Sequence, residues 1–84
     1  MPKFMDVHSG MTGITSEALR SEHAKDLEQQ KSERGVKFLK VWADPNAGKV
    51  FCLSEGPDRE AIQRVHQRAG HPAQEIYEVS IEQD

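Results

Sequence analysis

Several residues of this chain are of the types that bind transition-metal ions. Two histidines stand five positions apart in the segment "HQRAGHP", and a third ends the short segment "KFMDVH" near the N-terminus. Imidazole, carboxylate and thiolate groups together suit a first-row transition metal. The candidate metal ligands are, in order of preference, His8 and His71, then Asp6, His66, Glu78 and Cys52.

The spacing of these candidates matches no compact motif such as CxxC or HExxH. Any site must therefore be assembled from separate elements, or from two subunits. Each candidate also has an ordinary structural alternative. A histidine can donate a hydrogen bond to a loop, interact favourably with the negative end of a helix dipole, or simply lie in a turn. A lone cysteine is usually a small buried side chain. We expect His23, which lies in the apolar stripe of a helix, to be a hydrogen-bonded core histidine.

The elements that must position these residues follow from patterning. Alternation and β-branched or aromatic residues predict strands at 3–8, 36–43, 49–55 and 75–81. Thr15 or Ser16 should cap the first helix, which should run to about Arg34, where Gly35 stops it. A second helix should follow the Asp58 cap and end at Gly70 and Pro72.

The resulting order β-α-β-β-α-β is that of the α+β ferredoxin-like fold. We expect a single domain over residues 1–84, with a four-stranded antiparallel sheet in the order 4-1-3-2 and both helices on one face. His8, His66, His71 and Glu75 should then meet at one edge of the sheet. Glu78 should come close to Asp6.

Period-two patterning divides the sheet into two faces. The helix-facing set is predicted to be Met5, Val7, Leu39, Val41, Phe51, Leu53, Tyr77 and Val79. The opposite, open face is predicted to carry Phe4, Asp6, His8, Phe38, Lys40, Trp42, Val50, Cys52, Ile76 and Glu78. Because that open face is rich in apolar side chains, we expect a homodimer that packs sheet to sheet, with the metal near the interface.

Composition excludes several other classes. The 84 residues carry a net charge of −3 with no basic stripe, which argues against nucleic-acid binding. No apolar run is long enough for a signal peptide or a membrane span. The single cysteine fits a reducing, cytoplasmic setting.

The segments "FCLSEGP" (51–57) and "HQRAGHPAQEIYEV" (66–79) carry a family resemblance. With "FMDVHSGMTGITSEAL", they make nearly the whole chain similar to the small bacterial nickel-responsive, nickel-binding proteins, best known from actinomycetes. This resemblance implies a ferredoxin-like cytoplasmic homodimer that binds Ni²⁺ near the dimer interface. It supplies no ligand set.

Three functions follow as hypotheses. The first is a non-enzymatic nickel-binding dimer that acts in metal sequestration or homeostasis. The alternative is a small-molecule-binding protein or cofactor-independent enzyme of the dimeric α+β barrel type, with His8 as general base. The third is a module that binds another protein through its open face.

Overall fold

The computed structural model describes residues 1–84, and its elements follow the predicted order. The strands are β1 (Lys3–His8), β2 (Lys37–Asp44), β3 (Lys49–Glu55) and β4 (Glu75–Glu78). The helices are α1 (Ser16–Gln29), α2 (Arg59–Arg68) and the short 3₁₀ turn η1 (Gln30–Ser32).

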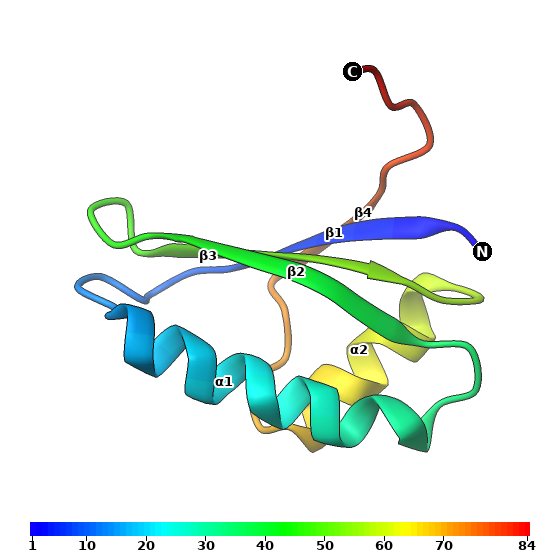
Figure 1. Ribbon diagram of the computed structural model, residues 1–84, viewed down its shortest axis with the longest axis horizontal. Coiled ribbons are helices and arrows are strands. Elements are labelled where there is room, and N and C mark those ends of the chain that lie inside the picture. The colour runs from blue at the N-terminus through cyan, green and yellow to red at the C-terminus, as the bar shows by residue number, and fades with distance from the viewer.

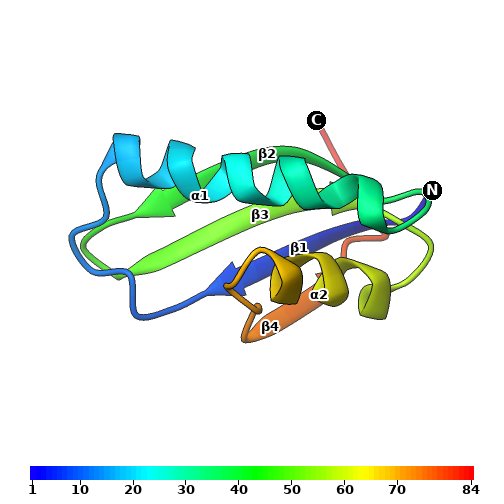
Figure 2. The same ribbon diagram turned by 90° about the horizontal axis from the view of Figure 1, so that it is seen from below.

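The four strands form one antiparallel sheet in the order β2-β3-β1-β4. Both helices cover the same side of this sheet, below it in Figure 1. Seen from below, α1 lies along β2 and β3, and α2 lies over β1 and β4 (Figure 2). The predicted fold and strand order are confirmed.

Side-chain caps begin both helices where the sequence predicts them. The Thr15 hydroxyl accepts a hydrogen bond from the Ala18 amide at 3.1 Å, and the Asp58 carboxylate accepts one from the Ala61 amide at 2.8 Å. Each cap satisfies a backbone donor that the first turn leaves without a partner. The caps therefore set the start of each helix over the sheet.

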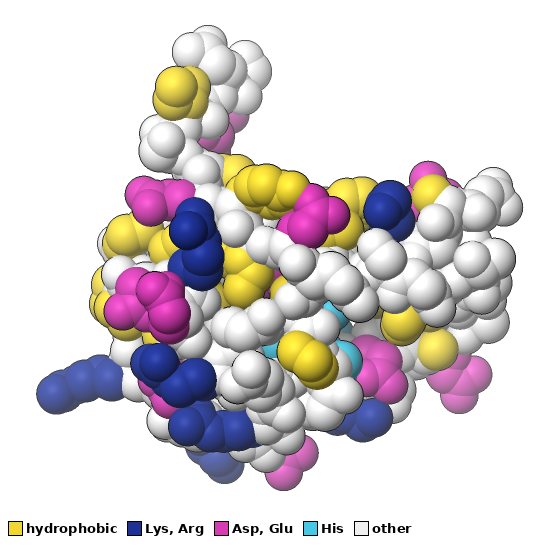
Figure 3. Space-filling view, turned by 180° about the vertical axis from the view of Figure 1, so that it is seen from behind, with side chains coloured by type: hydrophobic (Ala, Val, Ile, Leu, Met, Phe, Trp, Pro, Cys, Tyr) yellow, Lys and Arg dark blue, Asp and Glu magenta, His cyan; other side chains and the backbone are white.

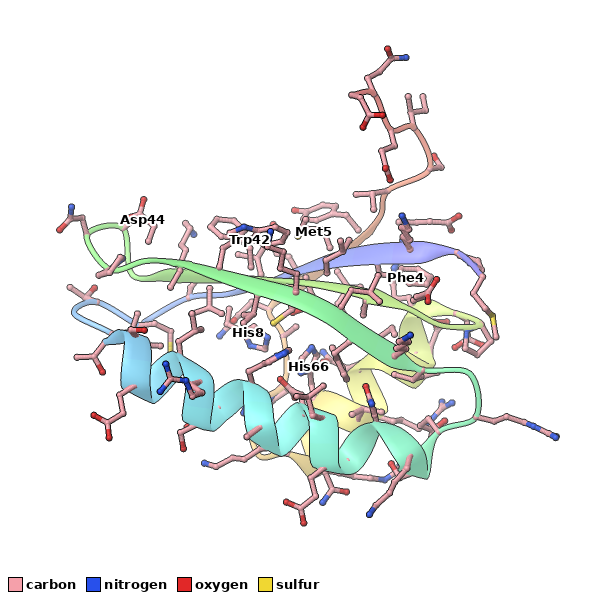
Figure 4. All side chains as sticks on the ribbon, in the orientation of Figure 1. Phe4, Met5, His8, Trp42, Asp44 and His66 are labelled. Carbon is pink, nitrogen blue, oxygen red and sulfur yellow. The ribbon has the colours of Figure 1, made fainter.

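The predicted assignment of faces is wrong for β1, β3 and β4. Phe4, Asp6, His8, Val50 and Cys52 are buried beneath the helices. The labelled Phe4 and His8 lie on the helix side, whereas Met5 points to the open side (Figure 4). The apolar core under the helices comprises Phe4, Val36, Phe38, Ala61, Ile62 and Val65, with Ile76 packed against it. Alternation of side chains along a strand shows which residues share a face of the sheet. It does not show which of the two faces the helices cover.

An irregularity in β2 changes the parity within that strand. The register with β3 shifts between Phe38 and Lys40, as at a β-bulge. Phe38, predicted for the open face, is therefore buried, whereas Trp42 beyond the irregularity is 40% exposed on the open side, as predicted.

Strand β4 is shorter than the predicted 75–81. It pairs antiparallel with β1, and β1 offers no partner before Lys3. The Val79 amide makes the last bond to β1, at the Lys3 carbonyl (3.0 Å). The C-terminal residues then leave the sheet on its open side (Figure 1). Neither helix has the length and apolar character needed to cross a membrane.

Candidate metal centre

The centre of the site is a row of buried polar side chains on the helix-facing side of β1 and β3. Asp6 is fully buried, and its Cα is paired with that of Cys52 on β3. His8, two residues along β1, shares this face and is 6% exposed. Three types of donor group, carboxylate, imidazole and thiol, are thus brought together by strand pairing.

A helix-end motif brings the other two histidines to the same place. At the end of α2 the His71 amide donates to the His66 carbonyl (3.0 Å), and the Gly70 amide donates to the Gln67 carbonyl (3.1 Å). These two bonds are those of a Schellman motif, and Gly70 adopts the left-handed conformation that it requires (φ +89°). The motif turns the chain back, so that the rings of His66 and His71 lie 5.5 Å apart, centre to centre.

His66 connects the sheet to both helices. Its Nε2 lies 2.8 Å from Asp6 Oδ2, and its Nδ1 lies 2.9 Å from Asp26 Oδ1 on α1. Both ring nitrogens face carboxylate oxygens, which accept hydrogen bonds, so the imidazole is held as a doubly protonated cation. Asp6 and Asp26 are both buried, and each is thereby paired with a positive charge.

The same network continues from Asp26 to the surface. Asp26 Oδ1 also lies 2.8 Å from His71 Nε2, and His71 Nδ1 lies 2.9 Å from Glu22 Oε2. The His71 side chain is 21% exposed and that of Glu22 is 36% exposed. Only small parts of histidine side chains are visible on the face seen in Figure 3. The cluster therefore meets solvent through His71 and Glu22.

Burial and ion pairing oppose each other in this cluster. Burial disfavours the charged imidazolium, but the hydrogen bonds to Asp26 and Asp6 outweigh it and raise the pKa of His66 to about 9. Burial likewise opposes ionisation of the two aspartates, yet the hydrogen bonds from His66 hold the pKa of each below its usual value. Burial, together with the charges of Asp6 and Asp26, raises the pKa of the Cys52 thiol, which is protonated at neutral pH.

Three buried atoms in this network, His8 Nε2, Asp6 Oδ1 and His71 Nδ1, make no aligned hydrogen bond. His8 Nε2 and Asp6 Oδ1 are 2.9 Å apart, close enough for an ion pair, but they are not aligned as a hydrogen bond. Buried polar atoms without a partner are costly and call for an explanation, such as an ion. This contact places an imidazole nitrogen and a carboxylate oxygen side by side, where both could bind one ion.

The distances between the donor groups suit a single ion. Asp6, His8, Cys52 and His66 each offer one ligand atom, and these atoms lie within 4.8 Å of one another. Two ligand atoms on opposite sides of a transition-metal ion, each about 2.0–2.3 Å from it, lie roughly 4.0–4.6 Å apart. A second group with the same property is formed by Asp26, His66 and His71. The residues present therefore fit a transition-metal ion.

The structure brings some of the predicted site residues together and leaves others apart. His8, His66 and His71 meet as predicted, with ring centres 4.8–5.5 Å apart. Glu78 does not approach Asp6: the Cα partner of Glu78 on β1 is Phe4, and that of Asp6 on β4 is Ile76. Glu75 is exposed and accepts a hydrogen bond from the Tyr77 hydroxyl instead of joining the histidines.

The open-face placement predicted for three of the candidate ligands is wrong. Asp6, His8 and Cys52 are buried because the faces are reversed, and the labelled His8 lies between the sheet and the helices (Figure 4).

Sequence reasoning missed Asp26, although the signal was present. Asp26 lies three residues after His23 and seven after Leu19, on the stripe of α1 that faces the sheet. A charged residue in so thin a stripe indicates a buried partner of opposite charge, here His66.

Comparisons with known proteins identify the family of this chain. Residues 4–79 match the family model described as nickel responsive protein SCO4226-like. The crystal structure of SCO4226 from Streptomyces coelicolor A3(2) superposes with a TM-score of 0.93 at 56% sequence identity. The match covers 96% of this chain and 99% of that one. A search of curated proteins found no match. The family match spans nearly the whole chain, and the chain therefore belongs to the SCO4226-like family of nickel-responsive proteins.

Proposed function

We propose that this protein binds Ni²⁺ in the buried cluster and serves in nickel sequestration or homeostasis. The observation that carries the proposal is the buried contact of 2.9 Å between His8 Nε2 and Asp6 Oδ1, which is not aligned as a hydrogen bond and has the Cys52 sulfur within 4.8 Å. These three side chains are the proposed ligands. They combine imidazole, carboxylate and thiolate, a mixed set that suits a borderline ion such as Ni²⁺.

His66 has a supporting role in this proposal. Its Nε2–H bonds the second oxygen of Asp6, so the first oxygen, which faces His8 Nε2, is the one proposed to bind the metal. Such a partner orients a ligating carboxylate and contributes to affinity. Asp26 and His71 also act through His66 in this proposal and are not ligands. Asp26 Oδ1 is already hydrogen-bonded to His66 Nδ1 and to His71 Nε2.

The proposed assembly is a homodimer through the open sheet face. On that face, Phe51 lies beside Trp42, and Leu53 lies beside Met5, in the register of the paired strands. Trp42 and Tyr77 are 40% and 51% exposed, so a second sheet would remove much apolar surface from water.

Calorimetric titration of Ni²⁺ into metal-free protein tests the site. We expect His8→Ala to weaken binding by about 100-fold or more, because a ligand is lost, and His71→Ala by roughly tenfold, because only support is lost. His23→Ala is the matched control, since His23 lies near the cluster but in neither donor group.

Circular dichroism must show that each variant folds. Nickel affinity that is unchanged in folded His8→Ala would overturn the proposed site. If His23→Ala lost as much nickel affinity as His8→Ala, the loss would not be specific to the proposed ligand His8.

A further inference from the structure

The segment formed by residues 79–84 makes almost no contact with the rest of its own protomer. Beyond Val79 it has no regular structure, and Ile81 is 85% exposed. After the bond from the Val79 amide, its one further hydrogen bond is the exposed ion pair between Glu82 and Lys3, at 3.3 Å. An exposed pair of this kind contributes little to stability. The segment is therefore available to a surface outside its own protomer.

The sequence of this segment is nevertheless that of a strand. Val79 and Ile81 continue the alternation of β4, and each has a polar residue on either side. In the protomer this pattern has nothing to pair with, because β1 begins at Lys3 and the Val79 amide already bonds the Lys3 carbonyl. An exposed apolar side chain at a strand position indicates a contact made with another molecule.

The segment leaves the sheet on the side where a second sheet is proposed to pack. Figure 1 shows it rising away from the sheet, opposite both helices. Sheets that pack face to face lie about 10 Å apart, and six extended residues span roughly 20 Å. A sheet packed on the open face is therefore within reach of residues 79–84.

The proposed dimer would bury a cation that has no counter-charge in its own protomer. In the register of the paired strands, Lys40, Leu53, Met5 and Tyr77 form one row across the open face. Lys40 Nζ lies 5.3 Å from the ring centre of Trp42, and Lys40 takes part in none of the ion pairs of the protomer. Because an unpaired buried charge is costly, the second copy must supply a carboxylate.

We propose that residues 79–84 of each copy pack on the open face of the other copy. Ile81 would contact the apolar row, and Glu82 or Asp84 would pair with Lys40 of the second copy. The inference rests on the proposed dimer and adds the segment that completes its interface. The acidic segment and the unpaired lysine are complementary in charge.

The symmetry of a sheet-to-sheet dimer allows this exchange. The two edges of the sheet are β2 and β4. A two-fold axis parallel to the strands sets the β2 edge of one copy over the β4 edge of the other, so the segment that follows β4 emerges near Lys40 of the second copy. The contact is then made twice, once by each copy.

Carbodiimide cross-linking tests the ion pair, because this reagent joins an ammonium to a carboxylate only where the two are in contact. Unlabelled and isotope-labelled copies are mixed, cross-linked and digested, and the joined peptides are identified by mass. We expect Lys40 joined to Glu82 or Asp84 in pairs that contain one labelled and one unlabelled peptide. These pairs should be absent from Lys40→Gln. Joined pairs that all come from one copy would overturn the proposal.

Ile81→Ser tests the apolar contact, and Leu27→Ser is the matched control. Both side chains are exposed apolar groups of the protomer, but Leu27 lies on α1, away from the open face. Since two Ile81 contacts are lost per dimer, we expect the dissociation constant of the dimer to rise about 100-fold in Ile81→Ser. It should stay unchanged in Leu27→Ser. Sedimentation over a dilution series measures it, and circular dichroism checks that each variant folds.

The outcomes separate this proposal from the functions on which it rests. If the wild type dimerises and Ile81→Ser dimerises as tightly, the segment contact is overturned and the dimer stands. If the wild type is a monomer, the proposed dimer fails first and the segment contact fails with it. No proposed nickel ligand lies in residues 79–84, so nickel titration of Ile81→Ser judges the nickel site independently.

Discussion

His66 joins Asp6 on the sheet to Asp26 on α1, with ring-nitrogen to oxygen distances of 2.8 and 2.9 Å. Each of the two carboxylates would be an unpaired buried charge without it. Removing one partner of a buried charge network is much more destabilising than the net stability of the network suggests. Stability and the proposed metal binding would therefore depend on the same imidazole.

The first prediction concerns the stability of the metal-free protein against pH. The folded pKa of His66, about 9, is above the ordinary value of 6.5. Its contribution is therefore complete below pH 6.5 and is lost as the pH rises through 9, a loss on the order of 3 kcal/mol. Urea unfolding between pH 6 and 10 measures it. His66→Gln should lack this pH dependence and His23→Gln should keep it; a flat wild-type profile would contradict the assignment.

The second prediction concerns Cys52. Because its thiol is protonated at neutral pH, coordination through sulfur must release a proton. We expect about one proton per nickel ion, measured by calorimetry in buffers of different ionisation enthalpy. A sulfur-to-nickel absorption band should appear in the wild type and be absent from Cys52→Ser. The same band in Cys52→Ser would remove Cys52 from the ligand set.

At the scale of elements, the Schellman motif at the end of α2 makes two histidines five residues apart into neighbours. It depends on Gly70, whose φ of +89° is strained for any residue with a Cβ. A Cβ at Gly70 would meet nothing within 4 Å, so a substitution there changes the backbone preference without a steric clash.

The third prediction is that Gly70→Ala lowers the free energy of unfolding by about 1–2 kcal/mol. Nickel binding should weaken with it, since His71 and Asp26 lose their alignment. Gly70→Asn should recover part of both, because asparagine tolerates the left-handed region better than alanine does. Denaturant unfolding and nickel titration of the three proteins provide the comparison. Equal stability of the glycine and alanine proteins would argue against a required left-handed residue.

At the scale of the whole molecule, the two faces of the sheet have separate roles. The helix-facing side holds the buried candidate ligands, and the open side carries apolar groups such as Trp42, with Lys40 Nζ 5.3 Å from its ring centre. Hydrophobic side chains gather along the sheet side of the face shown in Figure 3, and charged side chains surround the helices. The proposed metal site and the proposed dimer interface are therefore on opposite sides of one sheet.

The fourth prediction follows from that separation. Trp42→Glu should convert the proposed dimer to a monomer, because it places a charge at the centre of an apolar interface. Nickel binding should persist, since all proposed ligands lie on the other face. Leu27→Glu, at a similarly exposed apolar position on α1, is the control. Light scattering after size exclusion distinguishes the states, and a wild-type monomer at micromolar concentration would overturn the proposed dimer.

Local patterns in the sequence were sufficient to predict the element order, the caps at Thr15 and Asp58, and the strand order. Each of these depends on neighbouring residues or on connection length, which the sequence displays directly. The meeting of His8, His66 and His71 followed from the same topology. Family membership was also recognisable from the segments around Cys52 and His66.

The tertiary structure alone decided which face of the sheet the helices cover and which carboxylates join the site. Alternation is symmetric between the two faces, so Asp6 could be assigned to either one, and the shift between Phe38 and Lys40 mixed the pattern further. Polar groups on the buried face looked like surface groups, because their partners are distant in sequence: Asp6 meets His66 sixty residues away, and Asp26 meets it forty residues away. A buried charge is recognisable only with its partner, and the fold brings the partners together.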